Sequence, residues 1–229
     1  MVTTDWSGVR ERIEALARKD KAQVVFGAWN LYGAQGHQFR LAAPLLEEQI
    51  SEAEAQLRVS LPEDYRAFLV QVGAGGAGPA YGISSLIQEG GAWSWSGPGA
   101  ESDLDQLHLP FPRHDVIVEA LAEQVAQEPV EQAFDSREEY LRAFRAWDDE
   151  GEALFGQLTT GAVCLGHEGC GTYDWLVVSG AERGSVWFDD RPTDAGLTPL
   201  GPPDARVRFS EWYLNWLDAS EARVDHENH

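Results

Sequence analysis

Two consecutive helices followed by a glycine-rich turn constrain the fold more than any other feature of the sequence. Apolar residues recur at helical spacing from Leu46 to Leu57, and a second such stripe follows in "LPEDYRAFLVQVG". This pattern predicts two short amphipathic helices. Pro62 suits the first position of the second helix, and Gly73 suits its end. The next stretch, "VGAGGAGPAYGISSL", must then reverse the chain and lead into a strand.

The glycine-rich stretch raises the alternative of a phosphate site. A P-loop requires a strand, the glycines and then a helix that begins with Lys and a hydroxyl residue. Here the order is helix, glycines, strand, and no Lys follows Lys21. A dinucleotide site fails too, because no helix N-terminus follows to receive the pyrophosphate. A turn that needs positive φ or close backbone approach explains the glycines better. The predicted structural turn residues are Gly73, Gly75, Gly76, Gly78, Pro79 and Tyr81.

The remaining pattern indicates an α+β fold, with a mainly antiparallel sheet flanked by helices. Helical spacing is visible over residues 6–19 and 116–127, from Ser136 onward, and from Ser210 to Leu217. Strands are predicted at "QVVFGAWNLYG", "AYGISSL", "AVCLG", "YDWLVVSG" and "GSVWFDD", whereas "QEGGAWSWSGPGAESD" and "LTPLGPPDARVR" are predicted loops. We divide the chain into an N-terminal helix and strand extension (1–43), a domain (44–219) with a helical insertion at about 116–156, and a frayed tail (220–229).

The charge excludes several classes of partner. The chain has 38 acidic and 17 basic residues, a net charge of −21. Residues 1–43 hold six of the basic and four of the acidic residues, so the excess of negative charge lies in residues 44–229. Such a surface repels nucleic acid and anionic membranes, and it attracts basic proteins. Solubility alone is the alternative explanation. A cytoplasmic location is expected, because two cysteines are too few for a disulfide framework and no signal peptide or membrane span is evident.

Two motifs contain residue types that can bind a metal ion or act in catalysis. Cys164, His167 and Cys170 in "CLGHEGC" offer two thiolates and an imidazole to zinc, or a Cys–His nucleophile, but no fourth zinc ligand or orienting residue is evident. A buried free thiol is the more ordinary explanation. The acidic run "WFDDRPTD" lacks the regular ligand spacing of a calcium loop. We therefore expect no catalytic residues, no metal site and no cofactor.

Acidic and aromatic residues are the candidates for binding a partner. In "WDDEGE", three acidic residues would oppose the helix dipole if the helix ends near Gly151, a local conflict that suggests a binding site. In "AWSWSGPG", alternating Trp residues in a glycine-rich loop would suit an exposed aromatic anchor. The predicted partner-binding residues are Trp93, Trp95, Asp148, Asp149, Glu150, Asp189 and Asp190.

The block "EAEAQLRVSLPEDYRAFLVQVGAGGAGPAYGISSL" resembles the signature of the SUKH (Smi/Knr-like) superfamily, and the later "EGCG…LVVSGAERGSVWFDDR" and "EWYLNWLD" resemble its sheet and last helix. Ala74 departs from the pattern, since many members carry Asn there. The resemblance implies an α+β fold and carries no catalytic residues. Bacterial members are mostly inferred to be immunity proteins, and fungal members regulate cell-wall synthesis.

Three functions follow from these observations. The first is an intracellular immunity-type protein that neutralises a basic, nuclease-like protein toxin by direct binding. The second is a regulatory or scaffold domain that binds a cellular protein or small ligand in a groove near the glycine turn, bounded by Tyr81 and Trp93. The third, an enzyme that uses Cys164, His167 and Cys170, is the least favoured.

Overall fold

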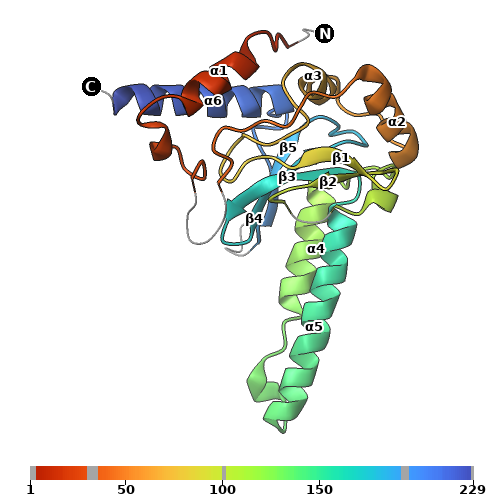
Figure 1. Ribbon diagram of the computed structural model, residues 1–229. Coiled ribbons are helices and arrows are strands. Elements are labelled where there is room, and N and C mark those ends of the chain that lie inside the picture. The colour runs from red at the N-terminus through yellow and green to blue at the C-terminus, as the bar shows by residue number, and fades with distance from the viewer. Residues whose placement is uncertain (1–3, 30–35, 100–101, 192–195, 228–229) are drawn as a thin grey trace.

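A computed structural model describes residues 4–29, 36–99, 102–191 and 196–227. A compact body contains the sheets and most helices, and a long helical hairpin projects from it (Figure 1). The helices of the described residues are α1 (Val9–Ala17), α2 (Glu47–Leu57), α3 (Glu63–Gln71), α4 (His114–Ala126), α5 (Arg137–Leu158) and α6 (Phe209–His226). Short 3₁₀ turns are η1 (Ala22–Val24), η2 (Leu104–Gln106) and η3 (Glu131–Ala133).

All strand pairs are antiparallel, so the predicted α+β class is confirmed. Strands β1 (Ser85–Glu89) and β2 (Ala92–Ser96) form one hairpin. The larger sheet has the order β3-β4-β5-β6, in which each strand pairs with the next along the chain. Its strands are β3 (Ala162–Gly169), β4 (Thr172–Val177), β5 (Val186–Asp190) and β6 (Gly196–Pro199).

Aromatic side chains from both ends of the chain form the main core. Trp6 packs edge-on against Phe68 of α3, with ring centroids 5.3 Å apart, and Phe209 of α6 lies 5.2 Å from Phe68. The buried side chains of α1, including Ile13 and Leu16, belong to the same cluster. Residues before α2 are thus part of this core, a point that the sequence did not decide.

The prediction of a frayed tail from residue 220 is wrong. Helix α6 runs to His226, and Ser220 and Val224 are buried. Its polar face pairs with α1, where Arg12 donates to Glu221 from Nε at 3.0 Å and to Asp218 from Nη2 at 2.5 Å. Hydrogen bonding to these carboxylates raises the pKa of Arg12. Polar residues that seemed free to fray in the sequence are therefore held by the N-terminal helix.

The glycine-rich stretch forms the structural turn that the sequence predicts. Gly76 has a φ of 107°, and a Cβ at this position would lie 2.4 Å from the main-chain oxygen of Arg40. The turn is closed by two main-chain bonds between Gly76 and Ile83, of 3.0 and 2.7 Å. Pro79 also accepts from the amide of Gly82 at 2.8 Å. Residues 80–84 remain in this turn, so the predicted strand begins only at Ser85.

Three other predicted elements are corrected. Residues 23–29, predicted to begin a strand, lie in η1 and turns, while residues 30–33 of that prediction lie outside the described part. The predicted loop around Trp93 is the β1–β2 hairpin, whose turn residues Gly90 and Gly91 both have positive φ. Residues 197–199, also a predicted loop, belong to β6 on the edge of the larger sheet.

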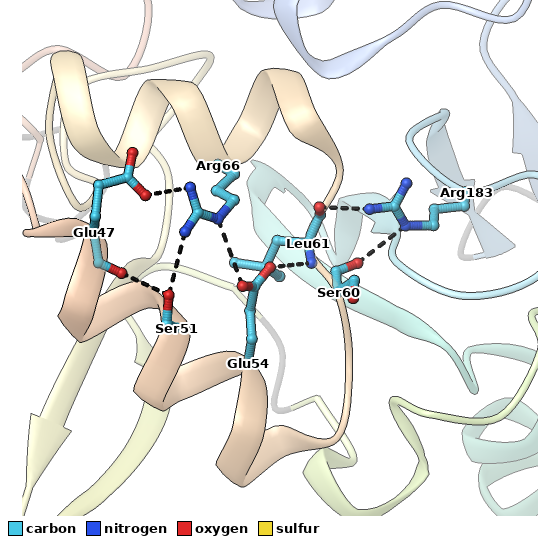
Figure 2. A network of polar contacts seen from close by, with 7 residues as sticks. All are labelled: Glu47, Ser51, Glu54, Ser60, Leu61, Arg66 and Arg183. Atoms are coloured by element: carbon cyan, nitrogen blue, oxygen red, sulfur yellow. Dashed lines mark hydrogen bonds and ion pairs between the residues drawn. The ribbon is translucent and has the colours of Figure 1, made fainter.

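A polar network ties α2, α3 and the β4–β5 connection together (Figure 2). Arg66 of α3 forms ion pairs with Glu47 and Glu54 of α2. Glu54 also accepts from the amide of Leu61 at 2.8 Å. Arg183 donates to the main-chain oxygens of Ser60 at 3.0 Å and Leu61 at 2.5 Å. The connection between α2 and α3 is therefore fixed from both sides, which positions the glycine turn that follows α3.

Candidate binding surface on the helical hairpin

The hairpin of α4 and α5 is anchored only at its base. There Phe111, Ile117 and Leu158 pack with the larger sheet, in a second core that includes Trp175 and Trp187. Ile117 is the one buried residue of α4, and Leu158 is the one buried residue of α5, two helices that the structure describes in full. A 22-residue helix is about 33 Å long at 1.5 Å per residue. Most of α5 therefore lies beyond the body.

Local sequence signals define α5. The side chain of Ser136 accepts from the amide of Glu139 at 3.3 Å and so caps the N-terminus of the helix. Glu138 and Arg142 form an ion pair one turn apart. The helix continues through Gly151 to Leu158. Asp148, Asp149 and Glu150 are consequently in the middle of the helix, and the predicted conflict with its negative end does not exist.

The two helices hold each other through an aromatic row and a pair of hydrogen bonds. Half-buried Phe134, Tyr140, Phe144 and Trp147 follow one another with neighbouring ring centroids 5.2–5.9 Å apart. The Gln124 side chain donates to the main-chain oxygen of Trp147, and the Trp147 indole donates to that of Gln124, both at 2.7 Å. These reciprocal bonds fix α4 against α5 and leave the outer faces of the hairpin open to solvent.

The exposed surface of the hairpin is acidic with apolar residues between the charges. Residues 114–158 contain twelve acidic and three basic residues, a net charge of −9 in about a fifth of the chain. Asp148, Asp149 and Glu150 are exposed, and none of them has a cation within ion-pairing distance among the described residues. Val125 and Val130 are also well exposed, at 64% and 61%. This surface therefore combines unpaired negative charge with accessible apolar side chains.

A pocket of about 670 Å³ lies where the hairpin meets the sheet. The lining residues come from both hairpin helices and from β4, the end of β5 and β6: Leu121, Gln124, Val125, Trp147, Asp148, Gly151, Glu152, Leu154, Phe155, Tyr173, Arg191 and Gly196. The walls are mostly apolar, and two carboxylates from α5 stand among them. Sequence reasoning identified only Asp148 of this set, because the pocket exists only when distant segments are brought together.

Arg191, which lines this pocket, forms a partly buried ion pair with Asp189. Arg191 donates from Nε to Oδ1 at 2.7 Å and from Nη2 to Oδ2 at 3.0 Å. The guanidinium carbon also lies 3.1 Å from the centre of the Phe155 ring, in cation–π geometry. Asp189 is 0% exposed, so its prediction as an open contact for a partner is wrong. Asp190, the neighbouring candidate, is half-buried.

The two candidate Trp residues are built into the body. Trp93 is 1% exposed and exchanges main-chain bonds with the side chain of Gln56. The indole of half-buried Trp95 donates to the hydroxyl of Tyr65 at 2.8 Å. Residues two apart on a strand share a face, and this face is turned toward the core. An exposed anchor at Trp93 is therefore wrong, because the predicted loop is a strand.

The cysteine motif shows ordinary structural roles. Cys164 is buried in β3, whereas Cys170 is exposed in the β3–β4 turn. His167 lies beside Tyr81, with stacked rings 5.7 Å apart, and its Nε2 accepts from the amide of Gly171 at 3.2 Å. Across the described part of the chain, no group of three or more His, Cys, Asp and Glu side chains is arranged to hold a metal ion.

Asp174 of β4 is a buried carboxyl that the sequence gave no reason to select. It is 4% exposed, and burial together with neighbouring Glu168 raises its pKa well above the ordinary value. The two acids lie on adjacent strands of the larger sheet. Such a perturbed pair can mark a functional site, but Asp174 is not among the residues that line the pocket at the hairpin base.

A smaller hollow of about 210 Å³ lies beside the glycine turn. Phe26, Ala80 and Trp216 are among its lining residues. Phe26 is 49% exposed and packs edge-on against Tyr81, with ring centroids 5.7 Å apart. The predicted groove near this turn therefore has a counterpart, but neither Tyr81 nor Trp93 is among the residues that line it.

Among the described residues, no helix has the length and apolar character needed to cross a bilayer.

Comparison with known proteins places the chain in a family. The model of the SMI1/KNR4 family (SUKH-1) matches residues 44–200, which is more than half of the chain. No curated protein and no solved structure matches. The matched segment runs from the start of α2 through the glycine turn and the hairpin to β6. The chain is a member of the SMI1/KNR4 (SUKH-1) family.

Proposed function

We propose that the chain is an immunity-type protein that neutralises a basic, nuclease-like protein toxin by direct binding, and that the α4–α5 hairpin is its contact surface. Family membership supports a protein-binding role. The single observation that carries the proposal is the projecting hairpin, whose 45 residues have a net charge of −9 and bury two side chains in the body.

Charge complementarity supports a basic partner. Unpaired carboxylates on a projecting element produce a local negative potential that extends into solvent. Such potentials raise the association rate with an oppositely charged protein, and the effect weakens with salt. Nucleases that bind a phosphate backbone present basic surfaces. An acidic hairpin could cover such a surface and block access of the nucleic acid.

Apolar residues on the same element support stable binding. Exposed charges alone contribute little to affinity, whereas buried aromatic and aliphatic side chains dominate the energy of protein interfaces. The hairpin offers Val125, Val130 and Leu141 at its surface and the aromatic row just beneath it. We propose Asp148, Asp149 and Glu150 as contact residues, with the half-buried Trp95 and Asp190 as secondary candidates on the body.

Neutralisation can be tested with any toxin domain found by sequencing the reading frames that neighbour the gene for this chain. We expect co-expression to restore growth of cells that produce the toxin domain, and purified protein to abolish its nuclease activity near one equivalent. The proposal would be contradicted if co-expression failed to restore growth and if the toxin domain kept its full nuclease activity at a large excess of the purified protein. The contact residues are tested with the variant Asp148→Lys/Asp149→Lys/Glu150→Lys. Its charge control is Asp20→Lys/Asp204→Lys/Glu227→Lys, because these three residues are exposed and lie outside the hairpin.

The hollow beside the glycine turn favours a second candidate, a regulatory or scaffold domain. In this case a cellular protein or small ligand would bind at Phe26, Ala80 and Trp216. The variant Phe26→Ala should weaken capture of that partner, while the hairpin charge variant Asp148→Lys/Asp149→Lys/Glu150→Lys should leave it unchanged. The reverse pattern would reject this candidate.

A further inference from the structure

The pocket at the base of the hairpin offers a site for one side chain of the partner, and this inference rests on the proposed function. The pocket adjoins the proposed contact residues. Asp148 lines it, whereas its neighbours Asp149 and Glu150 lie outside the lining. A volume of about 670 Å³ is within the range of pockets that bind small ligands, so it can accommodate a large side chain. The question is which chemistry it would select.

Apolar residues line most of the pocket. The apolar lining consists of Leu121 and Val125 of α4, Leu154 and Phe155 of α5, and Tyr173 of β4, among others. Burying an aliphatic or aromatic group against these residues is favourable, at roughly 25 cal/mol per Å² of apolar surface removed from water. A polar group without a long apolar stem would lose this contribution. The lining therefore selects a side chain that is apolar along most of its length.

Two carboxylates determine the preferred charge. Asp148 and Glu152 are four residues apart on α5, so they lie on one face and repel each other. The described residues place no cation within ion-pairing distance of either. The nearby cation, Arg191, already has a bidentate partner in buried Asp189. The uncompensated charge of the pocket is consequently negative, and a cationic group would relieve the repulsion.

We propose that this pocket binds an arginine side chain of the basic partner, with its aliphatic stem against the apolar lining and its guanidinium between Asp148 and Glu152. Arginine fits better than lysine because a planar guanidinium can bond two carboxylates at once and can stack on aromatic rings. Arg191 over Phe155 shows the same stacking within this pocket. A second copy of the chain is disfavoured as the occupant, because its net charge is −21.

A probe that needs no toxin tests the pocket. N-acetyl-arginine N-methylamide is titrated into the full-length protein, while NMR follows the backbone amide of Gly151 and the indole N–H of Trp147. The citrulline analogue has nearly the same shape without the charge. We expect saturable shifts of both signals with the arginine probe, and at least tenfold weaker binding of the citrulline probe. Equal responses to the two probes, or no response to either, would overturn the proposal.

Matched variants locate the charge that is responsible. Asp148→Asn/Glu152→Gln should weaken binding of the arginine probe at least tenfold, whereas Glu119→Gln/Glu123→Gln, which removes the same charge from exposed hairpin positions outside the lining and outside the proposed contact residues, should change it less than twofold. Equal effects of both variants would overturn the assignment to the pocket. Loss of toxin neutralisation and loss of probe binding are separate readouts, so failure of the pocket is distinguishable from failure of the proposed function.

Discussion

Helices α5 and α6 are both long, and they use their apolar residues in different ways. Helix α6, with 18 residues, buries Phe209, Tyr213, Leu217, Ser220 and Val224 in the body. Helix α5, with 22 residues, buries only Leu158. In Figure 1, α6 lies with α1 at one end of the molecule and the hairpin extends from the other. The apolar residues of α6 therefore stabilise the body, whereas many apolar residues of the hairpin stay exposed or half-buried, where a partner can contact them.

The largest difference is expected from truncating an aromatic side chain in each region. Phe209 is 0% exposed and contacts Tyr65 and Phe68 at ring distances of 4.8 and 5.2 Å. Phe209→Ala should lower the free energy of unfolding by about 3–5 kcal/mol. Phe144→Ala, at a half-buried hairpin position, should lower it by about 1 kcal/mol. Urea denaturation measures both, and equal losses would contradict the division between body and hairpin.

A pH-dependent stability difference is expected from the body alone. Burial lowers the pKa of His37 from 6.5 to about 4, and its Nδ1 accepts from the amide of Phe39 at 2.9 Å. A histidine that stays neutral in the folded state stabilises the protein fully above pH 6.5, and this contribution is lost as the pH falls from 6.5 to about 4. The loss should be roughly 3 kcal/mol.

The variant His37→Asn isolates this effect, because an amide oxygen can accept the same hydrogen bond without titrating. Denaturation curves between pH 7 and pH 4 should show a smaller loss of stability for the variant than for the wild type. Identical pH profiles would show that His37 titrates normally in the folded protein.

Two Gly→Ala substitutions should have opposite signs in the two regions. Gly76→Ala places a side chain at positive φ and against the backbone of Arg40, which should cost roughly 2–3 kcal/mol. Gly156→Ala in α5 meets nothing within 4 Å, so the higher helix propensity of Ala should add about 0.5–1 kcal/mol. Thermal denaturation distinguishes the two. A destabilised Gly156→Ala variant would mean that α5 packs more closely than the structure shows.

The most local effect is expected at the bonds between the hairpin helices. Trp147→Phe removes the indole bond to the main-chain oxygen of Gln124, which should cost about 1 kcal/mol. Because the hairpin lies outside the body, hydrogen exchange should accelerate in α4 and α5 while the slowest amides of α6 stay unchanged. Faster exchange in α6 would indicate that the two regions unfold together.

Local patterns were sufficient for much of the body. Helical periodicity predicted α2 and α3 of the body, as well as α4 of the hairpin, and the glycine-rich stretch was correctly interpreted as a turn because its order excluded a P-loop. The sequence analysis did not predict the β1–β2 hairpin, although the two glycines of its turn, Gly90 and Gly91, lie between alternating residues and are a known signal for such a turn. The neighbouring serines and glycines made the segment look like a loop.

Other features depend on contacts that no local pattern contains. Residues 220–226 stay helical because Arg12 and Lys19, some 200 residues earlier, pair with this helix. Asp189 is buried because Arg191 reaches back over two residues to neutralise it. The pocket at the hairpin base is formed by residues of α4 and α5 together with residues of the larger sheet, which are distant from one another in the sequence. The acidic residues 148–150 were selected from the sequence for an incorrect reason, yet they lie on the surface that we propose for binding.

The association rate with the toxin domain tests the proposed role of the hairpin most directly. Stopped-flow kinetics at low and high salt would compare the wild type with Asp148→Lys/Asp149→Lys/Glu150→Lys and with the control Asp20→Lys/Asp204→Lys/Glu227→Lys, which changes the net charge equally. We predict that the hairpin variant associates at least tenfold more slowly at low salt and with a flatter salt dependence, and that the control changes the rate less than threefold. Equal slowing by both variants would show that net charge, and not the hairpin, directs binding.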